Sequence, residues 1–212
     1  MRALRPEPQF ATLAQQAEVA QLGMWVFIAT EVVFFGALIF TYFVYRGAYP
    51  ADFAAAAYDT KLWCGSLNVA LLLTSSLSIV LAIEAAAEGQ RRALLLWLLV
   101  TALLGIGFLG IKGYEYLADY RNQVVPALNF LLKPGHRPPA ELFWVFYFIA
   151  TGVHAIHLTI GVGLVLLMLA RVRRGTIGPV YYAPLEVVGL YWSFVDTVWI
   201  FLFPALYLVG RG

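Results

Sequence analysis

Ionisable side chains stand deep inside long apolar segments of this sequence. Glu31 lies in a run of apolar and aromatic residues, as do His154 and His157, and Asp196 lies near the middle of the aromatic segment 191–203. A charged group at such a depth in a bilayer costs several kcal/mol unless it faces protein or water. These groups either join helices through hydrogen bonds or take part in proton transfer, and the helices that carry them must pack into a bundle.

The spacing of the acidic residues adds a further expectation. Glu186 precedes Ser193 and Asp196 by seven and ten residues, so the three share one helix face. Counted from one end of their segments, Glu31, His157 and Asp196 fall within about 6 Å of depth and could form one polar layer. No continuous polar file crosses from face to face. The candidates for proton- or lipid-related roles are Glu31, His154, His157, Glu186 and Asp196.

The histidines and the single cysteine give no basis for a metal centre. His154 and His157 are three residues apart on one expected helix face, a spacing that two metal ligands could use. The third histidine, His136, belongs to a proline-rich loop, and Cys64 has no second cysteine to pair with. A haem–copper centre needs several histidines on several helices. We therefore expect neither a metal site nor a catalytic residue in this chain.

A second group of polar residues includes both signs of charge. Lys112 and Glu115 are three residues apart and can pair locally on a helix. Both lie near the outer part of their apolar segment, so Lys112 could extend its ammonium towards water. We expect them to form a structural polar pair. The residues that share their helix face, at steps of three or four, are Thr101, Gly105, Phe108 and Asp119.

The composition describes the elements that must position these side chains. Hydrophobic residues make up 62% of the 212 residues and charged residues only 12%, against roughly a quarter in a soluble domain. The net charge of +2 gives no indication of nucleic-acid binding. Apolar runs of about 20 residues without alternation predict membrane-spanning helices. We predict an all-α membrane protein with a five-helix transmembrane domain over residues 22–209, its helices at about 22–45, 62–87, 93–117, 142–170 and 185–209.

The remaining segments and the orientation follow from position and charge. Residues 1–21 are expected to form a cytoplasmic or interfacial segment, 119–141 an ordered external loop and 210–212 a tail. Tyr42 and Tyr207, near span ends, are expected in an aromatic belt. An N-terminus in the cytoplasm and an external C-terminus are predicted by arginines directly against helix ends, namely Arg91, Arg92, Arg171, Arg173 and Arg174.

Five motifs, in order along the chain, indicate a family. The patterns LGxxFxxxKxxEY and FYxxTGxHxxH are matched at 104–116 and 146–157. Segment 24–36, around Glu31, and segment 68–76 provide two more, and Glu186 with Asp196 ten residues later completes the series. Together they resemble subunit III of the haem-copper respiratory oxidases, the cytochrome c oxidase subunit III family, in its short five-helix bacterial form.

The resemblance implies a non-catalytic subunit of a terminal oxidase. It places the carbodiimide-reactive glutamate of the family on Glu31. It also implies direct packing against subunit I, subunit II in the same complex, bound phospholipid, and support of proton uptake and lasting turnover. The complex would reduce O2 to water with electrons from cytochrome c or quinol and pump protons in the bacterial plasma (inner) membrane. Haem and copper are then expected in the partner subunits, and this chain would be a multi-pass protein without a cofactor of its own.

The chain departs from the family pattern at two points, and two other functions are compatible with its sequence. Ser193 stands where the family usually has histidine. Five spans instead of seven leave open whether the lipid cleft of the longer form exists here. The chain could instead be an accessory subunit of a nitric oxide reductase, which only companion subunits would reveal. It could also be an independent proton or solute transporter using Glu31 and Asp196, which would transport alone in liposomes.

Overall fold

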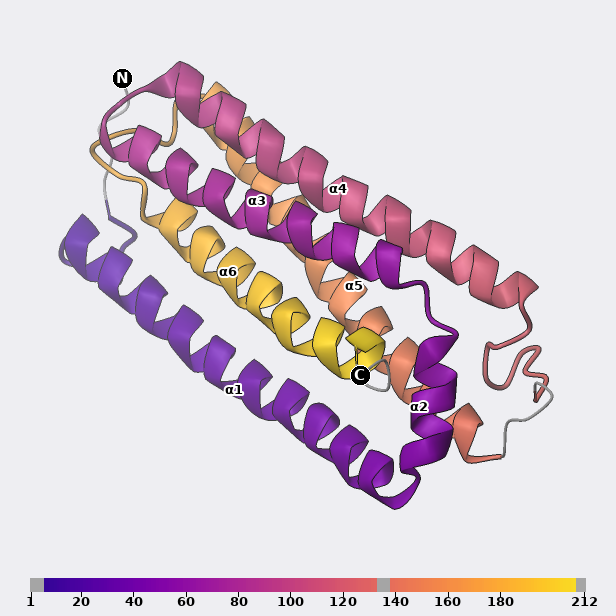
Figure 1. The fold of residues 1–212 in the computed structure, drawn as a ribbon. Helices are drawn as coiled ribbons and strands as arrows, with labels where there is room; N and C mark the ends of the chain where they lie inside the picture. The colour runs from indigo at the N-terminus through magenta and orange to yellow at the C-terminus, as the bar shows by residue number, and fades with distance from the viewer. Residues whose placement is uncertain (1–5, 133–137, 209–212) are drawn as a thin grey trace.

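The computed structural model describes residues 6–132 and 138–208, and its regular structure there is helical apart from one bridge between Gly178 and Tyr181 (Figure 1). Five long apolar helical segments are able to cross a membrane, which confirms the predicted all-α, five-helix bundle. The direction of crossing stays a prediction. The elements are α1 (Leu13–Ala48), α2 (Pro50–Tyr58), α3 (Leu62–Ala87), α4 (Arg91–Arg121), α5 (Pro139–Arg173), α6 (Ala183–Phe203) and a π-helical turn (Pro204–Leu208).

Local sequence explains where several helices begin and end. The Thr12 hydroxyl accepts a hydrogen bond from the Gln15 backbone N–H and caps the start of α1. Proline occupies the first turn of α2, α5 and α6, where its missing N–H costs nothing. Gly89 and Gly175 both have φ near 74°, a left-handed conformation that suits glycine and reverses the chain after α3 and after α5.

Helices α3, α4, α5 and α6 pack around a common core, and α1 lies alongside α6 at the edge of this group (Figure 1). The large ring of Trp192 fills the space between α6, α4 and α5. A Cβ atom on Gly105 would lie 2.8 Å from that ring, and one on Gly161 would lie 3.2 Å from it. Helix α1 is different, because Phe35 and Tyr42 are its buried side chains while most of its apolar surface is exposed. It is therefore attached to the bundle along one narrow face.

Two observed helices differ clearly from the expected segments. Helix α1 begins at Leu13, so the segment before residue 22 continues the first long helix. Helix α2, which the sequence analysis did not anticipate, packs against α5 and buries Phe53. Residues 1–5, 133–137 and 209–212 lie outside the described part of the chain. The expected tail, His136 and the end of the last span fall among them.

Candidate functional site

Glu31 of α1 and His157 of α5 form a pair across the boundary between α1 and the bundle. The carboxyl Oε2 lies 3.2 Å from Nε2 of the imidazole, and the two side chains are 18% and 16% exposed. The other ring nitrogen, Nδ1, lies 2.9 Å from the backbone oxygen of Val153. A carbonyl oxygen can only accept a hydrogen bond, so Nδ1 carries a hydrogen.

This arrangement leaves one proton to be shared between Glu31 and His157. With Nδ1 already donating to Val153, the contact between Nε2 and Oε2 is favourable only if a proton lies between those two atoms. Either an imidazolium donates to a carboxylate, or a carboxylic acid donates to a neutral imidazole. The pair is therefore able to hold a proton at an interface between two helices.

Neighbouring aromatic groups fix the orientation of this pair. The ring of Phe35, one turn after Glu31, lies edge-on to the His157 imidazole with 5.4 Å between ring centroids. The Tyr191 hydroxyl of α6 donates to the His157 backbone oxygen at 2.9 Å. Three helices thus converge on the pair. The sequence analysis missed Tyr191, because a tyrosine hydroxyl carries no positional signal until the helix neighbours are known.

Asp196 does not join Glu31 and His157. It is 3% exposed and points from α6 towards α3, where its Oδ2 lies 3.5 Å from the Ser75 hydroxyl. Ser75 also accepts a hydrogen bond from the indole N–H of Trp192 at 3.0 Å. Asp196 thus belongs to a buried contact between α3 and α6. Its polar neighbour is Ser75, and not Glu31 or His157, with which it was expected to share one polar layer.

His154 is separated from His157 despite their spacing of three residues. It is fully buried inside the four-helix core, between the rings of Phe108 and Trp199 at centroid distances of 5.4 and 5.0 Å. Neither of its ring nitrogens has a hydrogen-bond partner within the described residues. The two histidines therefore do not share a site, because His154 faces the core and His157 faces α1.

Glu186 lies near the start of α6, and its Oε2 accepts a hydrogen bond from the Gln21 amide of α1 at 3.1 Å. Both residues line an open groove of about 360 Å³ between α1, α3 and α6. Ser193, the residue that departs from the family pattern, lines the same groove together with Trp25. The smaller serine side chain thus stands at a surface that other molecules can reach.

Lys112 and Glu115 form a buried ion pair inside the bundle. The ammonium Nζ is 2.9 Å from Glu115 Oε2, and it donates to the hydroxyls of Tyr147 at 3.1 Å and Tyr207 at 2.9 Å. Tyr207 in turn donates to the Glu115 carboxyl at 2.9 Å. Lys112 is only 2% exposed, so its ammonium does not extend to water, which its position near the end of the span had left possible. Four aromatic rings lie 4.8–5.6 Å from Nζ, those of Tyr116, Tyr147, Trp199 and Tyr207.

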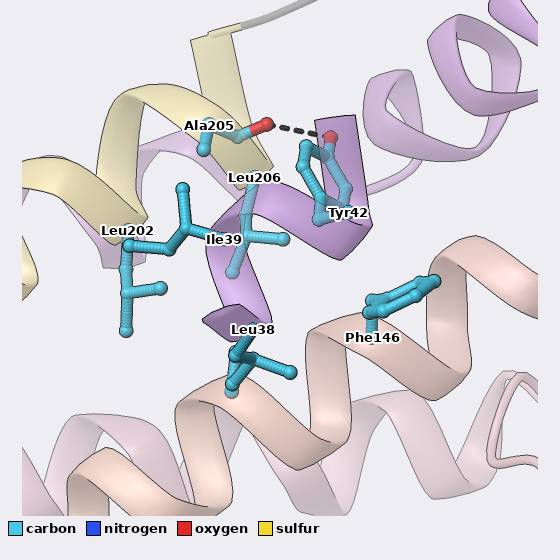
Figure 2. A pocket seen from close by; sticks show the side chains of 8 residues that line it. Leu38, Ile39, Tyr42, Phe146, Leu202, Ala205 and Leu206 are labelled. Atoms are coloured by element: carbon cyan, nitrogen blue, oxygen red, sulfur yellow. Dashed lines mark hydrogen bonds between the residues drawn. The ribbon is translucent and has the colours of Figure 1, made fainter. Parts of the chain in front are cut away.

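Helices α1 and α5 and the π-helical turn meet at a small pocket lined by Tyr42, Phe146 and Ala205 (Figure 2). The Tyr42 hydroxyl donates to the Ala205 backbone oxygen at 2.7 Å, next to a small apolar cavity of about 10 Å³. A cavity of this size and lining stays dry and has no room for a ligand. Tyr42 and Tyr207 are 4% and 0% exposed, so the expectation that they form part of an aromatic belt was wrong.

The geometry defines a multi-pass helical membrane protein that holds two pairs of ionisable side chains, Lys112–Glu115 and Glu31–His157, in its helical segments. In the part of the chain that the structure describes, no cluster of three or more histidine, cysteine, aspartate or glutamate side chains could hold a metal ion. Such a bundle can form hydrogen bonds, hold protons and pack against other chains.

Comparison with known proteins identifies the family. Residues 139–211 match the family model described as cytochrome c oxidase subunit III. The chain is 31% identical to "Cytochrome c oxidase subunit 3" of Alkalihalophilus pseudofirmus, over all of this chain and 96% of that protein. It is 30% identical to "Probable quinol oxidase subunit 3" of Staphylococcus aureus, over 92% of this chain and 91% of that protein. The chain belongs to the subunit III family of the haem-copper oxidases and acts as subunit III of such an oxidase. Both relatives are named as oxidase subunits, which agrees with the oxidase role that the sequence motifs imply.

Proposed function

We propose that this chain is a non-catalytic subunit in the bacterial plasma membrane that packs directly against oxidase subunit I and, with subunit II in the complex, supports proton uptake during O2 reduction. The observation that carries the proposal is the contact of 3.2 Å between Glu31 Oε2 and His157 Nε2, which is favourable with a proton between the two atoms. Both side chains are partly exposed, so the proton is held where it can exchange with a neighbouring group. A carboxyl–imidazole pair of this kind can pass a proton on without any metal.

The other ionisable residues receive supporting roles in this proposal. His154 and Asp196 are enclosed in the core, where they contribute polar contacts between helices. Glu186 ties α6 to Gln21 of α1 at one end of the bundle. Haem and copper belong to the partner subunits, and this chain contributes the surroundings in which they work.

Bound phospholipid is the second part of the proposal. Helices α1 and α6 enclose an apolar groove of about 260 Å³ that is open to one side. Its lining includes Val32, Phe35, Ile39, Phe194 and Phe201, side chains that suit an acyl chain. Phe35 also touches His157, so a lipid in this groove would lie next to the Glu31–His157 pair.

Substitution Glu31→Gln in the intact oxidase tests the assignment of Glu31. We expect the complex to assemble with an unchanged haem spectrum, because glutamine keeps the shape and can still hydrogen-bond to His157. Labelling of this subunit by a hydrophobic carbodiimide should disappear, because the reagent requires a carboxyl group. Glu18→Gln, an exposed change on the same helix, is the matched control and should leave the labelling intact. Labelling that persists in the Glu31→Gln subunit would show that another carboxyl has this role.

A further inference from the structure

Four polar contacts tie α1 to the rest of the chain along its length, and the first, at its start, is from the Gln16 amide to the Tyr181 hydroxyl at 3.1 Å. Gln21 then binds Glu186, Glu31 meets His157 in the middle, and Tyr42 binds the backbone of Ala205 at the other end. The contact residues Glu31 and Tyr42 are eleven positions apart, about three helical turns, so they lie on one face of α1. Phe35 and Leu38 occupy the same face between them.

These contacts matter more in α1 than in a helix of a soluble protein. Most of the apolar surface of α1 is exposed, and lipid tails are as apolar as the side chains they would replace. Hydrophobic burial therefore gives α1 little preference for one rotation or depth. Hydrogen bonds and close packing must therefore set its position. The hydrogen bond from Tyr42 to Ala205 does so near the C-terminal end of α1.

The partner of Tyr42 belongs to a short turn that is itself held by buried charges. Ala205 and Tyr207 are two residues apart in Pro204–Leu208. The Tyr207 hydroxyl accepts from Lys112 at 2.9 Å and donates to Glu115 at 2.9 Å. Its ring also rests on α3, where a Cβ atom on Gly65 would lie 3.0 Å away. The buried ion pair thus fixes the rotation of the turn, and the turn presents the Ala205 oxygen to Tyr42.

We infer that Tyr42 and Tyr207 are positioning residues for the Glu31–His157 pair. The Lys112–Glu115 ion pair anchors the C-terminal turn, the turn anchors the end of α1, and α1 sets the distance between Glu31 and His157. Tyr42 and Tyr207 touch neither Glu31 nor the proton that it shares. This inference rests on the proposed function of Glu31, because it concerns the placement of that same carboxyl.

The test is the rate at which a hydrophobic carbodiimide labels Glu31 in the intact complex. Tyr42→Phe keeps the ring and removes the hydroxyl that binds Ala205. With α1 loosened, Glu31 parts from His157 more often, and its carboxyl meets the reagent. The rate should rise about two- to tenfold, the factor that corresponds to one net hydrogen bond. Tyr45→Phe, an exposed change on the same helix, is the matched control and should leave the rate unchanged.

Tyr207→Phe separates positioning from direct contact. Tyr207→Phe acts only through the turn, so it should also raise the labelling rate of Glu31. The double variant, Tyr42→Phe with Tyr207→Phe, should label only slightly faster than the faster of the two single variants, because both act on the same contact. Leu98→Ala, a core change on α4, controls for general destabilisation and should lower Tm without raising the labelling rate. An unchanged rate in Tyr42→Phe, with Glu31 labelled in the parent, overturns the inference. Absence of Glu31 labelling in the parent overturns the proposed function instead.

Discussion

Substitution of Lys112 by methionine is expected to lower the free energy of unfolding by about 3–5 kcal/mol, the cost of leaving one member of a buried ion pair without its partner. Glu115 is 1% exposed, so its carboxylate would lose the ammonium without gaining water. Tyr147 and Tyr207 would lose the donor that they share. Thermal or detergent-induced unfolding of the purified complex, followed by release of this subunit, measures the effect.

Two further variants make this result specific to the ion pair. The double variant Lys112→Met with Glu115→Leu removes both charges, so its loss should be well below the sum of the two single losses. Arg121→Met removes an exposed cation from the last turn of the same helix, and it should cost about 1 kcal/mol or less. Strictly additive losses at Lys112 and Glu115 would show that the two charges do not depend on each other.

Removal of the whole subunit is expected to leave initial O2 reduction nearly intact and to shorten the period of sustained turnover severely. Under the proposed function the catalytic centre lies in partner subunits, so the first turnovers do not need this chain. Proton uptake then falls behind electron transfer, because the Glu31–His157 pair and the groove beside it are gone. Recording O2 consumption over many turnovers, together with protons taken up per electron, measures the difference.

Addition of the missing subunit provides the control for this experiment. The unmodified chain should restore lasting activity, whereas the Glu31→Gln chain should restore assembly with less recovery of proton uptake. Equal long-term activity and equal proton uptake with and without the subunit would instead indicate a pure scaffold.

The features that follow from helix geometry alone were predictable from the sequence. Spacings of three and four residues placed Thr101, Lys112, Glu115 and Asp119 on one face of α4, and all four are buried there. The Lys112–Glu115 contact is local, so it needed no knowledge of neighbouring helices. The long apolar runs likewise fixed the number of spans, because a bilayer demands about 20 apolar residues for each crossing.

The contacts between helices could not be read in the same way. His154 and His157 differ in their surroundings because one side of α5 packs in the core and the neighbouring side packs against α1. Their spacing in the sequence does not show which helices lie against each side. Tyr207 joins Lys112 across 95 positions of sequence. Tyrosine near a span end is also typical of a membrane interface, so its burial became apparent only once the C-terminal turn was seen to fold inward.

The metal and haem content of this chain, after its separation from the oxidase in mild detergent, tests the account most directly. We expect the separated chain to show no haem absorption and no stoichiometric copper, while the remaining subunits keep the full haem spectrum of the complex. Haem or copper that stays with this chain at one equivalent would contradict its proposed role as a subunit that holds protons and packs against the catalytic subunit without a redox centre of its own.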